Sequence, residues 1–209
     1  MLAAIKAPIR RIFSLTSTGA SGVVGIFYEY AAQGRHFMNT FVALLRAVNV
    51  GGTGKLAMSA LKMICTELGF TRVETYIASG NVVFDCRSTA ATVKSQLEQR
   101  LLRLAGRPVG VVIRSAAELR GVRDANPFPD REPAHVYACF LDAKPPAAVL
   151  DEVRGRTMEL IGVGKREIYV YYPFGMGKSR LRIPAASAGT ARNMNTVARL
   201  VAMTARRAD

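Results

Sequence analysis

The sequence contains no tryptophan and only two histidines, and acidic residues number 15 in a chain of 209. The histidines are His36 and His135, so a metal site built on several imidazoles is not expected. The same scarcity disfavours nucleophilic triads that use histidine as the base. No pair of carboxylates at a catalytic spacing is recognisable either. We therefore expect a protein without a metal or a cofactor.

Cysteine is also rare, with three residues and no C-x-x-C spacing. An odd number argues against a disulfide framework, so Cys65, Cys86 and Cys139 are interpreted as small apolar residues or free thiols in a reducing compartment. No uninterrupted apolar run is long enough to cross a bilayer. These absences predict a cytoplasmic protein without integral membrane association.

Basic residues dominate the charge, because 29 lysines and arginines give a formal net charge of +14. The excess is uneven: Lys165–Asp209 carries nine basic and two acidic residues. Such a basic region is typical of a phosphate or nucleic-acid footprint. A solvated basic face that keeps the protein soluble has the same composition. Charge alone leaves both interpretations open.

The first 37 residues differ from the rest of the chain. They have no stable hydrophobic period, and Glu29 is their one acid. An acid-poor start with arginine and serine resembles a targeting segment. Met38 lies three residues before the first expected strand, so a mis-assigned start is a second explanation, and a structured extension is the third. We expect residues 1–37 to be a separate, disordered or spurious extension.

Hydrophobic periodicity predicts regular elements from residue 41 onward. In the first half, the expected elements are strands at Phe41–Val48, Val73–Ala78, Val82–Asp85 and Val109–Ile113, a helix from Met58 that ends at Gly69, and a helix capped by Ser88 or Thr89 that ends at Gly106. Ser115 and Glu118 form a capping box that begins a short helix. The order β-α-β-β-α-β is that of a ferredoxin-like split βαβ unit.

The second half repeats this order loosely after a proline-rich turn at Asn126–Pro129. We expect a strand at His135–Leu141, a helix from Pro145 to about Val153, a hairpin from Glu159–Val163 and Glu167–Tyr172, and a final helix over Asn193–Ala205. The predicted fold class is α+β, with two small ferredoxin-like units whose antiparallel or mixed sheets carry helices. The corresponding domains are residues 38–129 and residues 130–209.

Two glycine-rich basic stretches, "GGTGK" and "GMGKS", suggest phosphate loops, but neither satisfies G-x-x-x-x-G-K-[ST]. Successive turn amides can still form a nest for an anion. The start of the last helix offers unpaired N–H groups as well. The candidate anion-binding residues are Arg46, Asn49, Lys55, Ser79, Asn81, Lys178, Arg180, Arg192, Asn193 and Asn195. In the structural alternative, the glycines only make turns and Asn193 only caps the helix.

Four segments, "FVALLRAVNVGG", "LGFTRVETYIASGNVVF", "ANPFP" and "ARNMNTVARL", resemble the bacterial family known as domain of unknown function 1697. The resemblance covers about residues 38–205. It implies two small α+β domains of ferredoxin-like type in one compact body, and no established activity. Met194 stands where the family usually has tryptophan.

Three hypotheses for function follow. The first is a binding protein for a phosphate-bearing or other anionic ligand, with non-specific nucleic acid among the candidate partners. The second is a small metal-independent enzyme that uses Arg46, Tyr76, Ser79 and Asn81. The third is a structural module that associates with itself through a sheet edge. The sequence does not determine the reaction, the ligand or the oligomeric state.

Overall fold

The computed structural model describes residues 38–49 and 56–207. This part of the chain has the predicted α+β fold. Its elements are β1 (Asn39–Leu45), α1 (Met58–Glu67), β2 (Thr71–Tyr76), β3 (Asn81–Cys86), α2 (Ala90–Ala105), β4 (Val111–Ser115), α3 (Ala116–Asp124), β5 (Val136–Phe140), β6 (Leu160–Val163), β7 (Glu167–Tyr171), the 3₁₀ helices η1 (Met176–Lys178) and η2 (Pro184–Ala188), β8 (Thr190–Asn193) and α4 (Met194–Ala205).

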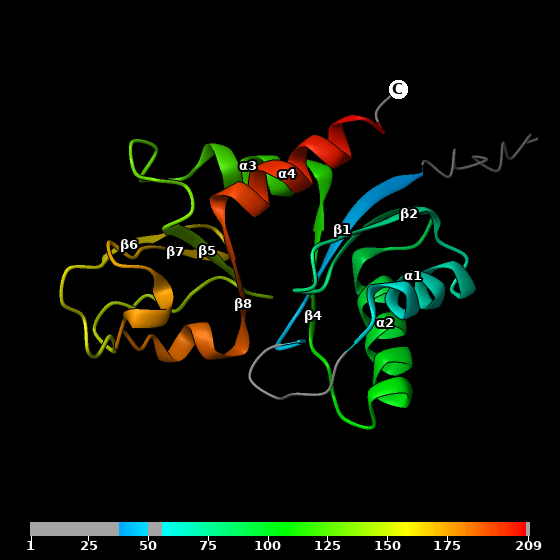
Figure 1. Ribbon diagram of the computed structural model, residues 1–209, viewed down its shortest axis with the longest axis horizontal. Coiled ribbons are helices and arrows are strands. Elements are labelled where there is room, and N and C mark those ends of the chain that lie inside the picture. Colours follow the sequence, from blue (N-terminus) through cyan, green and yellow to red (C-terminus); the bar gives the residue numbers. More distant parts are fainter. Residues whose placement is uncertain (1–37, 50–55, 208–209) are drawn as a thin grey trace, which may run out of the picture. The chain divides into compact units, whose positions relative to one another are not determined.

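The strands form two antiparallel four-stranded sheets with the same topology. The order is β2-β3-β1-β4 in the first sheet, called sheet A, and β6-β7-β5-β8 in the second, called sheet B (Figure 1). Each strand of sheet B thus occupies the position of the strand four places earlier in sheet A. The internal repeat predicted from the order of elements is confirmed at the level of topology.

The outer face of sheet A is covered by α1 and α2. Helix α2 begins at Thr89, whose hydroxyl accepts a hydrogen bond from the Thr92 N–H at 3.2 Å, and ends at Gly106 in the left-handed conformation. Val93, Leu97 and Leu101 are its buried residues, and they share a core with α1 and sheet A. The caps are those expected from the sequence. Helical spacing also predicts Leu104 in the buried stripe, but Leu104 is 53% exposed in the last turn.

A central core joins the two sheets. Val42, Leu44 and Val83 of sheet A share this core with Phe140 and Tyr169 of sheet B, and α3 and α4 complete it. The two helices pack on each other, and Figure 1 shows them running side by side. The apolar faces of α3 and α4 are therefore buried against residues of both sheets.

Two buried arginines also bridge the sheets in opposite directions. Arg114 of β4 donates to the backbone carbonyl of Leu141 at 2.7 Å and to Glu167 Oε1 at 3.0 Å. Arg192 of β8 donates to the backbone carbonyls of Leu45 at 2.9 Å and Ser79 at 2.8 Å. Each arginine directly precedes the residue that caps the next helix, Ser115 for α3 and Asn193 for α4. The two arginines therefore occupy equivalent positions in the repeat.

The helix predicted from Pro145 to about Val153 is wrong: the chain makes turns there. Val149 is 2% exposed, but Leu150 beside it is 49% exposed. Only Pro145 and Val149 are buried in this segment, and they cannot supply the continuous apolar stripe that stabilises a helix. Among the described residues, turns and η2 cover the outer face of sheet B, in place of the two helices on sheet A. The candidate site lies in this irregular cover.

Candidate functional site

Residues 154–159, which precede β6, and residues 179–182, which follow β7, are distant in sequence but pair with each other. The Arg154 N–H donates to the Arg182 carbonyl at 2.9 Å, and the Arg182 N–H donates to the Arg154 carbonyl at 2.8 Å. Gly155 follows with a φ of +65°, and a Cβ atom there would lie 2.4 Å from the carbonyl oxygen of Arg180. Only glycine permits both this backbone conformation and this close approach.

A buried carboxylate holds the two segments together. Glu159 is 5% exposed and accepts hydrogen bonds from the Thr157 N–H at 2.7 Å and from the Ser179 hydroxyl. Ser179 Oγ in turn accepts from the Leu181 N–H at 3.0 Å. These hydrogen bonds lower the pKa of Glu159 to about 2, because they favour the charged form. Glu159 therefore stays ionised and fixes the segment on either side of Ser179.

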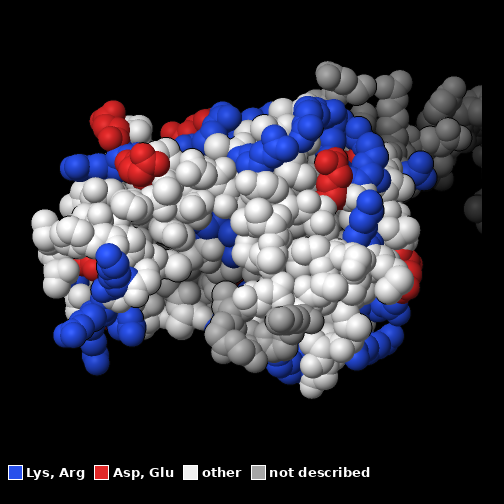
Figure 2. Space-filling view, in the orientation of Figure 1, with Lys and Arg blue, Asp and Glu red and all other residues white. Residues whose placement is uncertain are grey.

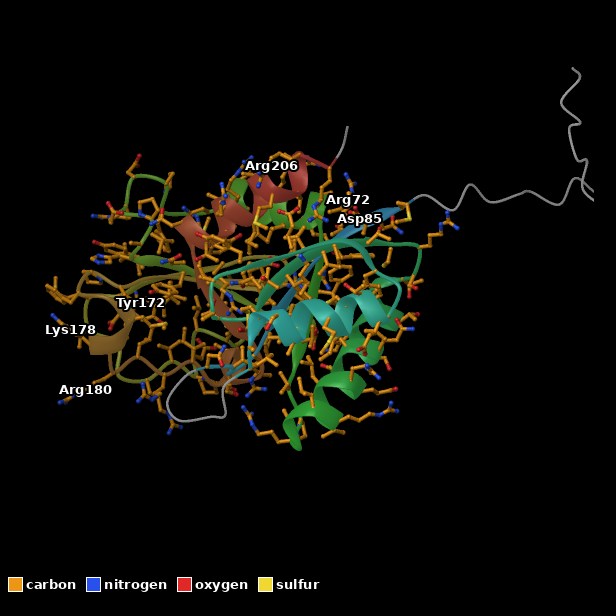
Figure 3. All side chains as sticks on the ribbon, turned by 45° about the vertical axis from the view of Figure 1, so that its right-hand side comes forward. Arg72, Asp85, Tyr172, Lys178, Arg180 and Arg206 are labelled. Atoms are coloured by element: carbon orange, nitrogen blue, oxygen red, sulfur yellow. The ribbon has the colours of Figure 1, made fainter. Side chains whose placement is uncertain are left out.

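The two segments enclose a cavity of about 490 Å³, called here the basic pocket. Arg156, Lys178, Arg180, Tyr172 and Phe174 contribute to its wall. Figure 3 shows the labelled Tyr172, Lys178 and Arg180 close together, away from the labelled Arg72 and Asp85. Burial raises the pKa of Tyr172 to about 12, so its phenol is neutral at physiological pH. Phe174 is 66% exposed at the rim.

Three cations, Arg156, Lys178 and Arg180, line this pocket. Two more, Arg154 and Arg182, lie on the same two segments, where their backbones pair with each other. All five are exposed, and within residues 38–49 and 56–207 none of them forms an ion pair with a carboxylate. Figure 2 shows lysine and arginine side chains gathered over the segment that follows β7. The lining therefore carries a net positive charge, because its three cations outnumber the Glu159 carboxylate.

Two buried clusters of charged groups outside the pocket have partners within the protein. Asp85 is 1% exposed, forms a salt bridge with Arg72 and lies 3.6 Å from Arg207 Nη1. Arg114 pairs with Glu167 at 3.0 Å. Both clusters stabilise the fold, and their charges are paired within the protein. The cations of the basic pocket have no such carboxylate partner in the described residues.

The structure places the predicted site residues in different surroundings. Lys178 and Arg180 line the basic pocket. Arg192 is 6% exposed, and its hydrogen bonds to protein oxygens use all five guanidinium N–H groups. Burial lowers its pKa to about 10. Asn193 accepts the Thr196 N–H at 3.0 Å, which is the capping role considered as the alternative.

The remaining predicted residues belong to the surroundings of Arg192 or to the surface. Asn81 accepts from Arg192 and donates to Ser79 Oγ at 3.0 Å. Asn49 donates to the carbonyls of Leu56 at 2.9 Å and Ala78 at 2.7 Å. These three side chains make internal contacts. Arg46 and Asn195 are exposed outside the basic pocket, and Lys55 lies outside the described residues.

Sequence reasoning missed Arg154, Arg156, Arg182, Glu159 and Phe174. A weak signal exists for the arginines, because basic residues alternate in "RGR" at 154–156 and in "KSRLR" at 178–182. The signal becomes specific only once the pairing of Arg154 with Arg182 is known.

Residues 38–49 and 56–207 contain no group of three or more His, Cys, Asp or Glu side chains suited to a metal ion. No helix there is long and apolar enough to span a membrane.

Comparison with known proteins identifies a family and a similar structure, but neither has a stated activity. A family described as "Protein of unknown function (DUF1697)" matches residues 38–169, which is more than half of the chain. The solved structure of the conserved bacterial protein SP0830 from Streptococcus pneumoniae is similar, with 22% identity and a TM-score of 0.65 over 80% of this chain and 99% of that chain. At this identity the likeness establishes the fold alone. No curated protein matches at a significant level.

Proposed function

We propose that this chain, which belongs to the DUF1697 family, binds a phosphate-bearing ligand in the basic pocket. The observation that carries the proposal is that three exposed cations line one cavity and two more lie on the same segments, all without a carboxylate partner in the described residues. Holding like charges together costs free energy unless a counter-charge binds. An anionic ligand supplies that counter-charge.

The chemistry of the wall favours phosphate. Arg180 offers a planar fork of N–H donors that matches phosphate oxygens, and Lys178 adds a mobile point charge. Arg156 offers its two terminal nitrogens, because its Nε donates to the Glu159 carbonyl at 2.9 Å. Glu159 is ionised, but its oxygens already accept hydrogen bonds from Thr157 and Ser179. It therefore holds the cations in place and does not neutralise them by direct contact.

The frame of the pocket is consistent with binding because the backbone that carries the donors is fixed before a ligand arrives. Gly155 and the paired backbones of Arg154 and Arg182 hold one side against the other. Preorganisation of this kind lowers the entropy lost on binding.

The test is a titration of the full chain with inorganic pyrophosphate, followed by calorimetry and by thermal shift. We expect a raised melting temperature that grows with ligand concentration, since a ligand that binds only the native state stabilises it. A K178A/R180A variant should lose this response. The matched control is R87A/R120A, which removes the same charge from two exposed arginines on other elements.

Equal responses in the two double variants would mean that net charge, and not the basic pocket, attracts the anion. No response in the parent protein to pyrophosphate or to any longer phosphate polymer would reject the proposal outright.

A further inference from the structure

We infer that the ligand of the basic pocket is an unpaired stretch of polynucleotide, whose phosphates follow the row of cations while a base stacks on Phe174. This inference rests on the proposed function and names its ligand class. Two further observations carry it: the cations form a row, and the pocket has an aromatic rim.

The row follows from the alternation of the chain. Lys178, Arg180 and Arg182 are exposed, whereas Leu181 between them is 7% exposed and Ser179 turns inward to Glu159. Successive residues of extended chain point to opposite faces, so Arg180 and Arg182 share one face, and Lys178, the last residue of η1, is exposed just before them. Four residue steps separate Lys178 from Arg182, at most about 13 Å, which is more than one phosphate group needs.

A second pair of cations lies beside these three. Arg154 and Arg156 flank Gly155, whose φ of +65° turns the chain, and Arg154 pairs directly with Arg182 across the antiparallel bridge. The positive charge is therefore spread over two paired segments, and a polyanion with several phosphates contacts more of it than a single phosphate does.

The rim of the pocket offers an exposed aromatic ring on which a base can stack. Phe174 and Met176 are 66% and 44% exposed, and Gly175 between them has a φ of +84° that turns the chain there. An exposed phenyl ring next to a cationic groove is the arrangement with which proteins bind single-stranded nucleic acids. In a duplex the base faces are stacked on one another, so only an unpaired base can cover this ring.

The experiment compares four probes on the full chain by fluorescence anisotropy or competition: a short oligothymidylate, the same sequence as RNA, a duplex of equal length, and inorganic polyphosphate. We expect both single strands to bind more tightly than the duplex. Their affinity should fall with salt with a log–log slope of about −2 to −3.5, as for three to five neutralised phosphates. Base identity should matter little.

Phe174→Ala separates stacking from charge. We expect it to weaken single-strand binding by about 5-fold to about 150-fold, the range of one lost stacking contact, and to leave polyphosphate binding unchanged. Phe174→Tyr, which keeps a ring, should restore binding, whereas Phe174→Leu should not. Leu102→Ala, at a residue of α2 that is 44% exposed, is the control for loss of exposed apolar surface.

The possible results distinguish the two proposals. If polyphosphate and the oligonucleotides bind equally well, and Phe174→Ala changes neither affinity, the polynucleotide inference is overturned. The proposal of phosphate binding then still stands. Tighter binding of the duplex also overturns the inference. No binding of any of the four probes, or of pyrophosphate, rejects both.

Discussion

At the scale of the residue, arginine has two distinct functions in this protein. Arg114 and Arg192 are buried, and they give their donors to carbonyls and side chains of the opposite sheet. Arg156 and Arg180 are exposed without an acid partner in the described part of the chain. A buried guanidinium with all donors used stabilises the fold. An exposed, unpaired one remains available to a ligand.

Glu159 anchors the segments that carry the exposed arginines, and its ionisation gives a test. Its pKa of about 2 in the folded protein lies below the ordinary value of 4.5. The stability that it contributes is therefore present above about pH 4.5 and is lost as the pH falls towards about 2. We expect Glu159→Gln to flatten the fall in unfolding free energy over this interval, measured by urea denaturation at several pH values.

The control for this prediction is Glu152→Gln, since Glu152 is exposed. Its stability curve should follow that of the parent between about pH 2 and 5. Parallel curves for the parent and Glu159→Gln would contradict the role of Glu159 as an ionised anchor.

At the scale of the element, the site depends on segments that have no regular secondary structure. The residues 154–159 and 179–182 are held by the paired backbones of Arg154 and Arg182, by Glu159 and by the close approach of Gly155 to Arg180. On sheet A, α1 and α2 cover the corresponding outer face. The second half of the fold has replaced that helical cover with a pocket.

Gly155→Ala tests whether this pairing shapes the pocket. The added methyl group would lie 2.4 Å from the Arg180 carbonyl oxygen, at a φ that alanine disfavours, so the two segments must separate. We expect pyrophosphate binding to weaken at least about tenfold, a loss of about 1.4 kcal/mol, by calorimetry. Gly177→Ala is the matched control, because nothing lies within 4 Å of its added Cβ. Equal pyrophosphate binding by both variants would show that the pairing of the two segments does not shape the site.

The elements were predictable wherever local signals agreed. Thr89, Gly106 and the Ser115 capping box mark helix ends, and all three have the expected geometry. Strand β8 was missed because it has four residues and follows an alanine- and serine-rich segment. Its omission hid the burial of Arg192, which sequence alone could not distinguish from an exposed cation. The site was predictable only in part, through Lys178 and Arg180, because its other half depends on a long-range pairing.

At the scale of the whole molecule, the repeat raises the question of whether its halves are independent. The proposed domains, residues 38–129 and 130–209, each contain one sheet. Residues of both sheets nevertheless share the central core with α3 and α4, and the two buried arginines join them. Separating the halves would expose apolar surface and leave buried carbonyls without donors. We therefore expect one cooperative unfolding transition.

Leu97→Ala decides between one unit and two. Leu97 is fully buried on the outer side of sheet A, whereas four of the seven tyrosines, Tyr137, Tyr169, Tyr171 and Tyr172, belong to sheet B or directly follow it. The substitution should cost about 2–5 kcal/mol. If the sheets unfold together, far-UV circular dichroism and tyrosine fluorescence will report the same lowered midpoint in urea. The exposed Leu102→Ala should shift neither. A tyrosine transition that stays at the parent midpoint would instead show that sheet B unfolds alone, because a cavity in one independent domain cannot destabilise the other.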